Sequence, residues 1–260
     1  MCPIRVFIDK DLLFHIRSEE HEEPSREMKK LIRSLLTTAI AMPLDRLPER
    51  DMFVQLSDVT MWVDPLDATE ELKDGLLDYV SVMICGTLQG SPVLGVVHLV
   101  FSNETSWGWM PNDFSHNLQP LPVHPLSSTA LRILVSRSHA TADLEAAITS
   151  AFAPVVVTIT RAGGAGYKIM QLLKGKADLY IHPSGARKWD LCAPIALLEA
   201  AGGVFRTMDG RRHHFLRLHP NSSIAEAGGI FAAATQALYH RWALTVRNLY
   251  RSLLRAKQST

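Results

Sequence analysis

The second half of the chain alternates between two kinds of hydrophobic pattern, and this alternation constrains the fold more than any other feature. Strand-like and helix-like runs follow one another from residue 131 to residue 254. The expected strands cover residues 131–135, 155–160, 177–182 and 230–233, and the expected helices cover residues 142–152, 167–173, 190–201 and 235–254. Such alternation is typical of sheets and helices stacked in layers, so the sequence predicts an α/β fold.

The first half of the chain is richer in β-patterns. Residues 80–87 and 92–101 are β-rich and are joined by Gln89-Gly90-Ser91, which predicts a β-hairpin. Prolines then cluster at positions 120, 122 and 125, as is common at a junction. We therefore expect a single domain over residues 1–260, with subdomains of about 1–128 and 129–260.

Composition excludes several classes of protein. The 260 residues carry 27 Lys and Arg against 26 Asp and Glu, a net charge of +1, so no nucleic-acid polymer is expected as a partner. The 3 cysteines show no CxxC spacing, which argues against a disulfide framework or a structural zinc site. The sequence shows neither a signal peptide nor an apolar run of about 20 residues, so the chain as written predicts a cytoplasmic protein.

The segment Trp62-Val63-Asp64-Pro65-Leu66-Asp67-Ala68-Thr69 carries the clearest chemical signal. A strand is expected to end at Asp64, and two carboxylates three residues apart are costly to bury without a partner. Pro65 has a fixed φ and biases Asp64 toward an extended backbone. The turn can therefore aim Asp64, the Leu66 carbonyl and Asp67 at one point, and such oxygen ligands suit Mg²⁺. The alternative is an acidic turn in which Asp67 or Thr69 caps a helix.

Two further acidic segments are ambiguous when each is taken alone. Asp190 precedes a mostly apolar helix, where an aspartate commonly serves as an N-cap. Ser18-Glu19-Glu20-His21 reads by itself as a charged loop.

Two segments of the second half are candidates for binding an anion. Gly163-Gly164-Ala165-Gly166 opens a helix that also carries Lys168, and free N–H groups at such a turn can bind phosphate. The same glycines could instead let a strand pass close to a helix. Ser136 and His139 follow an expected strand, although His139 alone is equally explained as a packing or surface histidine.

Taken together, these segments resemble the inositol monophosphatase family. The family signature is an acidic pair, then D-P-hydrophobic-D-G/A-T, then W-D-x-A/C-A-P heading a helix that ends in A-G-G. This chain has Ser18-Glu19-Glu20, Asp64-Pro65-Leu66-Asp67-Ala68-Thr69, Trp189-Asp190-Leu191-Cys192-Ala193-Pro194 and Ala201-Gly202-Gly203, in that order. The resemblance runs from about residue 15 to about residue 240 and implies a layered α-β-α-β-α sandwich.

The resemblance also implies a site with two or more Mg²⁺ ions. The implied metal ligands are Glu19, Asp64, the Leu66 carbonyl, Asp67 and Asp190. Glu19, Asp64 and Leu66 would hold the ion that carries the attacking water, and Glu19 and Thr69 would act in catalysis, with Thr69 orienting that water. Two ions held close together would clamp an in-line displacement at phosphorus.

The second half looks most like the 3′-nucleotidase branch of the family, which includes Golgi-resident members. By that resemblance Ser136, His139, Gly164 and Lys168 would contact the nucleotide, and the enzyme would hydrolyse adenosine 3′,5′-bisphosphate to AMP with sensitivity to lithium. The alternatives are an inositol phosphate phosphatase and a non-catalytic relative that binds a phosphorylated ligand. Homodimers are common in the family, so a homodimer is also implied.

The chain departs from the family pattern near its N-terminus. Family members carry a helix pair before the acidic loop, with a further catalytic Asp near its end. Only 18 residues precede Glu19, and Asp9 and Asp11 lie too close to Glu19 to replace that Asp. We therefore expect the N-terminal helix pair to be missing, in either a truncated chain or a short form. A Golgi location would follow by resemblance if the chain is truncated.

Overall fold

A computed structural model of the chain describes residues 58–118, 130–215, 225–226 and 228–258. Several predictions made from the sequence lie outside these described residues. They include the acidic loop with Glu19 and the expected absence of an N-terminal helix pair.

The first half of the described chain forms an antiparallel sheet, with strand order β1-β2-β3-β4-β5. Its strands are β1 (Val59–Asp67), β2 (Ser81–Leu88), β3 (Ser91–Leu99), β4 (Glu104–Trp109) and β5 (Asp113–Phe114). The pairing of β2 with β3 confirms the predicted hairpin. The short helices α2 (Thr69–Lys73) and η3 (Leu77–Tyr79) connect β1 to β2.

The prediction that the first strand ends at Asp64 was wrong. Strand β1 continues to Asp67, and its pairing with β2 becomes irregular between Asp64 and Asp67. Such an irregularity lets a strand stay in the sheet while its side chains change direction. The prediction treated Pro65 as the end of the strand and did not allow for this.

The second half forms a mixed sheet with strand order β10-β12-β8-β6-β7. Its strands are β6 (Ala130–Ser136), β7 (Val156–Ala162), β8 (Leu179–His182), β10 (Val204–Arg206) and β12 (Ile230–Ala233). Strand β6 runs parallel to both β7 and β8. A separate two-stranded ladder joins β9 (Ala186–Arg187) to β11 (Ala225–Glu226).

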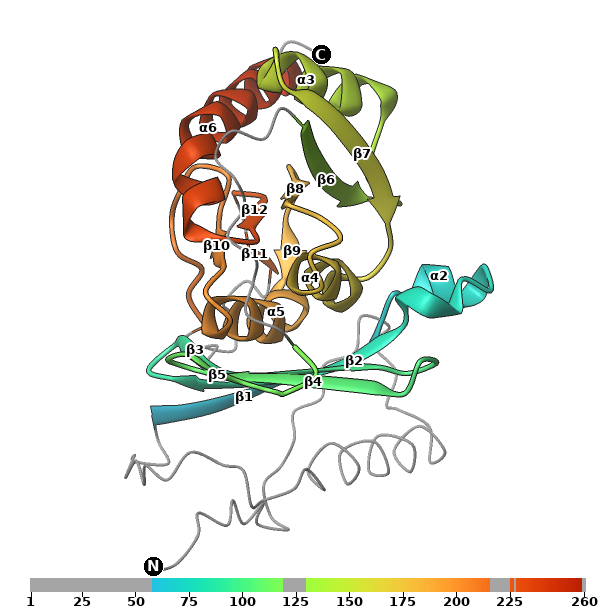
Figure 1. The fold of residues 1–260 in the computed structure, drawn as a ribbon, viewed down its shortest axis with the longest axis vertical. Helices are drawn as coiled ribbons and strands as arrows, with labels where there is room; N and C mark the ends of the chain where they lie inside the picture. The colour runs from blue at the N-terminus through green and yellow to red at the C-terminus, as the bar shows by residue number, and fades with distance from the viewer. Residues whose placement is uncertain (1–57, 119–129, 216–224, 227, 259–260) are drawn as a thin grey trace, which may run out of the picture. The chain divides into compact units, whose positions relative to one another are not determined.

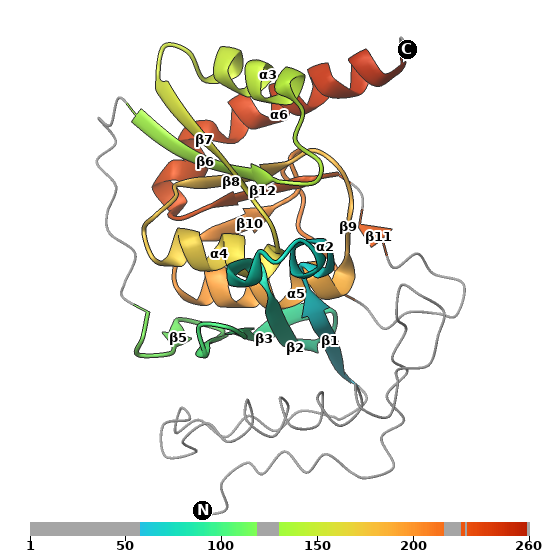
Figure 2. The same ribbon diagram turned by 90° about the vertical axis from the view of Figure 1, so that its right-hand side faces the viewer.

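The helices complete a layered α/β fold, as predicted. Helices α4 (Ala165–Leu173) and α5 (Lys188–Ala200) lie between the two sheets, and α3 (Ala142–Phe152) and α6 (Gln236–Gln258) cover the other face of the second sheet (Figures 1 and 2). The described residues thus stack as sheet, helices, sheet and helices. A change of sheet falls between Phe114 and Ala130, and the boundary of the subdomains near residue 128 stays a prediction.

Helix α5 is the centre of the packing between the layers. It is apolar on nearly all sides, and its residues from Leu191 to Leu198 are buried. Glycines in the first sheet permit the close approach, because a Cβ at Gly95 would overlap the Ala193 carbonyl and one at Gly108 would lie 2.9 Å from the Leu197 Cα. The helix that carries Asp190 is therefore held directly against the sheet that carries Asp64.

A disulfide between Cys85 of β2 and Cys192 of α5 reinforces this contact. Their Cα atoms are 5.7 Å apart and they are separated by 107 residues in the chain. The sequence analysis argued against a disulfide framework and did not anticipate this single bond. The pairing has no local sequence signal, because it depends on α5 packing across β2.

Replacing both Cys85 and Cys192 by Ala should lower the free energy of unfolding by about 2–5 kcal/mol, because the bond constrains a long loop of the unfolded chain. The measurement is urea unfolding of the oxidised protein, of the reduced protein and of the double variant. Reduction should destabilise the wild type and leave the double variant unchanged. Equal stability of the oxidised and reduced wild type would show that the bond does not support the fold.

Candidate functional site

The redirected end of β1 forms the first part of the candidate site. Asp64 is 5% exposed, and its Oδ1 accepts a hydrogen bond of 3.1 Å from the Leu66 backbone N–H. The Thr69 hydroxyl donates a hydrogen bond of 3.2 Å to the Leu66 carbonyl. The turn therefore links three of the predicted residues through its own hydrogen bonds.

Asp67 joins this turn to the rest of the site. Its Oδ2 accepts hydrogen bonds from the Ser81 hydroxyl at 3.0 Å and from the Gly166 N–H at 2.9 Å. The alternative that Asp67 or Thr69 caps a helix is not what the structure shows. The N-cap of α2 is Ala68, which has a φ of 68° and no side-chain cap. A left-handed alanine is a strained conformation of the kind that is common at functional sites.

Asp190 approaches the turn from helix α5. It lies in the first turn of the helix, and its Oδ2 accepts a hydrogen bond of 2.9 Å from the Arg187 N–H. The capping alternative is thus partly correct, although Asp190 caps from the third helical position. Its position in the first turn also brings its negative charge close to Asp64.

The aspartates are close enough to affect one another electrostatically. Burial raises the pKa of Asp64 well above its usual value, and repulsion from Asp67 and Asp190 raises this pKa further. In the part of the chain that the structure describes, no three His, Cys, Asp or Glu side chains are positioned to hold one metal ion. A cation would offset both the burial of the Asp64 carboxylate and its repulsion by Asp67 and Asp190, so these oxygen ligands fit a hard cation in their chemistry.

The glycine turn packs directly on this acidic segment. A Cβ at Gly163 would overlap the Glu71 side chain, and one at Gly164 would lie 2.6 Å from the Tyr79 carbonyl. Gly164 also has a φ of 57°, which favours glycine. The close-approach alternative therefore explains Gly163 and Gly164, and the Gly166 N–H is already bonded to Asp67. Contact of Gly164 with a nucleotide stays a prediction.

Lys168 points into the protein. Its residue is 4% exposed, and its Nζ donates a hydrogen bond of 3.3 Å to the Ala162 carbonyl and lies 5.1 Å from the centre of the Tyr180 ring. Burial lowers the pKa of Lys168 to about 8, against the opposing effect of Asp67, Glu71 and Asp190. The ammonium is thus paired electrostatically with the acidic cluster, and its predicted contact with substrate is untested.

Ser136 and His139 come together at the end of β6. The His139 Nδ1 lies 3.2 Å from the Ser136 hydroxyl and 2.9 Å from the Ser138 hydroxyl. The His139 ring also packs edge-on against His182, at 5.2 Å between centroids. The sequence reasoning missed Ser138 and His182, although both lie within segments that it singled out.

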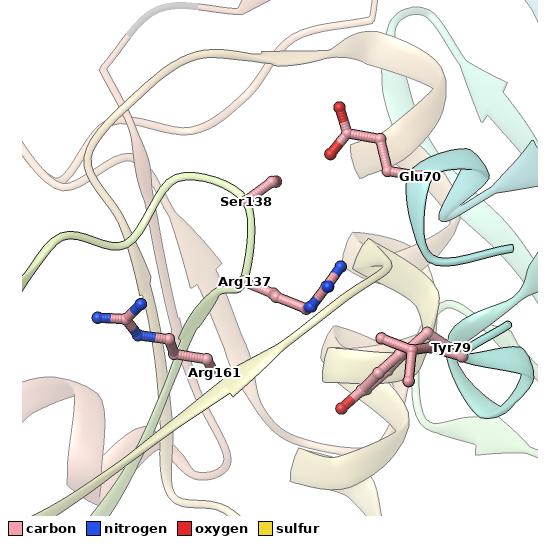
Figure 3. A pocket seen from close by; sticks show the side chains of 6 residues that line it. Glu70, Tyr79, Arg137, Ser138 and Arg161 are labelled. Atoms are coloured by element: carbon pink, nitrogen blue, oxygen red, sulfur yellow. The ribbon is translucent and has the colours of Figure 1, made fainter. Parts of the chain in front are cut away.

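A pocket of about 520 Å³ lies beside this loop, lined by Glu70, Leu76, Tyr79, Arg137, Ser138 and Arg161. Figure 3 shows the Arg137 side chain extending from the β6 loop toward Glu70 and Tyr79. The Arg137 Nη2 donates a hydrogen bond of 2.7 Å to Asp74, and Nη1 lies 3.7 Å from Glu71 Oε1. No local pattern in the sequence indicates this pocket, because its walls come from four separate segments.

Comparison with known proteins shows the family to which this chain belongs. A profile of the inositol monophosphatase family matches residues 29–249. The chain belongs to the inositol monophosphatase family. Among its relatives, the Golgi-resident adenosine 3′,5′-bisphosphate 3′-phosphatase of Bos taurus is 38% identical over 206 residues, which are 75% of this chain and 53% of that protein. The inositol monophosphatase 3 of Danio rerio is 37% identical over 181 residues, which are 67% of this chain and 50% of that protein.

The chain spans about half the length of the curated relatives that it matches. A solved structure of inositol monophosphatase II from Staphylococcus aureus shares the fold, with a TM-score of 0.62, 14% identity, and coverage of 88% of this chain and 91% of that one. The family is generally dependent on magnesium. Among the helices that the structure describes, none is long and apolar enough to cross a membrane.

The buried histidine beside His139 makes the stability of the fold sensitive to acid. Burial, together with Lys168 and His139, lowers the pKa of His182 to about 3. In the unfolded chain a histidine has a pKa of about 6.5, so between about pH 6.5 and pH 3 the unfolded state binds more protons. The contribution of His182 should therefore lower stability by up to about 1.4 kcal/mol for each pH unit below 6.5.

The His182→Asn variant isolates this contribution. Urea unfolding of both proteins from pH 8 to pH 4 should show a stability difference that shifts in favour of the variant as the pH falls. A difference that stays constant with pH would show that His182 titrates alike in the folded and unfolded states.

Proposed function

We propose that this chain is a magnesium-dependent phosphoric monoester hydrolase that removes the 3′-phosphate from adenosine 3′,5′-bisphosphate and leaves AMP. The observation that carries the proposal is the convergence of Asp64 and Asp67 from β1 with Asp190 from α5. The glycine turn lies beside Asp67, which accepts a hydrogen bond from the Gly166 N–H. The loop that holds Ser136 and His139 reaches the segment after β1 through the contact of Arg137 with Glu71. The name of the Bos taurus relative supports the same activity.

In this proposal the acidic residues hold the metal. Glu19, Asp64 and the Leu66 carbonyl would hold one Mg²⁺ ion. Asp64, Asp67 and Asp190 would hold another, and their side chains would have to move closer together to do so, because the described residues hold no three such side chains around one point. Bound magnesium would supply an activated water at neutral pH and neutralise the charge of the phosphate. The property of the described residues that supports this assignment is the position of Asp64, whose pKa is raised by burial and then by repulsion from Asp67 and Asp190.

Thr69 is suited to orient a water molecule. Its hydroxyl donates its proton to the Leu66 carbonyl, so the lone pairs of its oxygen remain available to accept a hydrogen bond. A water held by Thr69 would therefore lie beside an oxygen that the proposal assigns to the metal. Thr69 fixes the direction of the attacking water in this scheme and takes no proton from it.

The substrate side of the proposal rests on the loop at the end of β6. The hydroxyls of Ser136 and Ser138 both approach the His139 Nδ1, which fixes the ring in place. A fixed imidazole flanked by hydroxyls can hydrogen-bond a ribose or a base. Inositol phosphates are the second candidate substrate, because another relative is named as inositol monophosphatase 3.

A Golgi location is also part of the proposal, because a relative of this chain is named as Golgi-resident. The buried disulfide fits an oxidising compartment, where such bonds persist. A homodimer is likewise proposed, because homodimers are common in the family.

The direct test is phosphate release from adenosine 3′,5′-bisphosphate, 3′-AMP and inositol monophosphates by the purified chain in Mg²⁺, with and without lithium. Lithium-sensitive release from the nucleotides would support the proposal. Release from inositol monophosphates alone would favour the second candidate. A folded chain that releases phosphate from none of these compounds would contradict both and identify a non-catalytic relative.

The Asp67→Asn variant tests the metal assignment. Removing one carboxylate charge should lower kcat by a factor of about 100 or more, because that charge would stabilise the transition state through the metal. An amide oxygen can still accept the hydrogen bonds from Ser81 and Gly166, so the fold should remain intact by circular dichroism. Asp113→Asn in β5 is the matched control, and an unaltered rate in Asp67→Asn would exclude the assignment.

A further inference from the structure

Helix α6 has one side buried in the core and one side exposed with a single sign of charge. The buried side carries Leu238, Trp242, Val246 and Leu249. Over its 23 residues the helix has four arginines, one lysine and neither Asp nor Glu. Surface helices usually carry both signs of charge, since a glutamate and a lysine one turn apart stabilise each other. No such pair can form within α6, so its positive charge is directed at the surroundings.

Two leucines lie on the same exposed side. Leu244 is 66% exposed and Leu254 is 42% exposed. Leu244, Arg247, Arg251 and Leu254 follow one another in steps of three, four and three residues, which places them in one line along a helix with about 3.6 residues per turn. Both arginines thus lie between the two leucines. This surface can meet a partner that is negatively charged and apolar in turn.

The turn after β10 extends the basic surface. It packs against α6, because a Cβ at Gly210 would lie 2.6 Å from the Arg247 Nη2. The exposed residues Arg211 and Arg212 follow in this turn, and Asp209 is ion-paired with Arg211. On the neighbouring helix α3, both acidic residues lie in the first turn. The described residues next to Arg247 therefore add positive charge to the surface.

We propose that the exposed face of α6 is a docking surface for a lipid bilayer with anionic headgroups. This face is formed by Arg241, Leu244, Arg247, Arg251, Leu254 and Arg255. A second copy of the same face is a poor partner, because like charges repel. A soluble polyanion would match the charge but would leave both leucines in water. A bilayer accommodates both, with the arginines at the headgroups and the leucines at the acyl boundary.

In this arrangement α6 lies on the bilayer and does not cross it. Its apolar side is buried in the core, so only the exposed face is available to lipid. The helix is roughly 35 Å long, which allows contact with several headgroups. Figures 1 and 2 show α6 in the outer helical layer, on the side of the second sheet opposite to α4 and α5. The candidate site uses the starts of α4 and α5, so docking through α6 leaves it accessible.

The test measures binding of the full chain to phosphatidylcholine vesicles with and without about 30% phosphatidylserine, by flotation. Wild type should bind the anionic vesicles and not the neutral ones, and raising NaCl from about 0.1 M to about 0.5 M should weaken binding. Arg251→Gln should lower the partition coefficient about fivefold, because each basic residue near an anionic surface contributes about that factor. Leu244→Ser should lower it about tenfold, because a leucine side chain would stay in water.

Matched substitutions elsewhere act as controls. Lys73→Gln removes one positive charge from an exposed position on α2, and Phe101→Ser removes an apolar side chain that is 51% exposed between β3 and β4. Helix α2 and the first sheet lie away from α6 (Figures 1 and 2), so both variants should bind as the wild type does. Arg251→Lys keeps the charge and should also bind normally. Circular dichroism of each variant checks that the fold is intact.

The outcomes decide between a bilayer and other partners. The proposal is wrong if the wild type does not bind anionic vesicles, if neither Arg251→Gln nor Leu244→Ser weakens binding, or if Lys73→Gln weakens it as much as Arg251→Gln. If Arg251→Gln weakens binding, Leu244→Ser does not and heparin competes, the face binds polyanions through charge alone and the lipid assignment is wrong. None of these measurements depends on phosphate release, so the docking surface and the proposed function are tested separately.

Discussion

The burial of Asp64 beside two further carboxylates is the constraint on which the rest of this structure depends. Asp64 is 5% exposed, and Asp67 on the same strand and Asp190 on α5 both disfavour its charged form. The cost is reduced by fixed donors, namely the N–H groups of Leu66, Gly166 and Arg187 and the hydroxyl of Ser81. These donors belong to different elements, so satisfying the carboxylates also determines how those elements meet.

The packing around the site follows from that requirement. For Gly166 to donate to Asp67, the turn before α4 must lie directly on the α2 segment, and Gly163 and Gly164 leave no room there for a side chain. Gly95 and Gly108 do the same for α5 against the first sheet, and the Cys85–Cys192 bond fixes the contact covalently. Glycine thus occurs where an element that carries a charged residue of the site packs closely against another layer. Each of these positions serves electrostatics as much as packing.

The sequence predicts the parts of this arrangement that local patterns encode. The hydrophobic period and the turn residues indicate the α/β layering, the β2–β3 hairpin and the helix that carries Asp190. Three features escape such reasoning. The continuation of β1 past Pro65 depends on pairing with β2, the disulfide depends on α5 crossing that strand, and the pocket around Arg137 is assembled from four segments. All three are products of long-range packing, which no local pattern records.

Lys168 shows most clearly why residue type alone does not define a role. A lysine beside a glycine turn suggests an exposed cation for phosphate, yet this ammonium is enclosed by the Ala162 carbonyl and the Tyr180 ring. Asp67, Glu71 and Asp190 raise the pKa of Lys168 against the effect of burial. By the same interaction, the positive charge of Lys168 stabilises these carboxylates. The positive charge of Lys168 is therefore coupled to the acidic cluster, and its contact with a substrate stays a prediction.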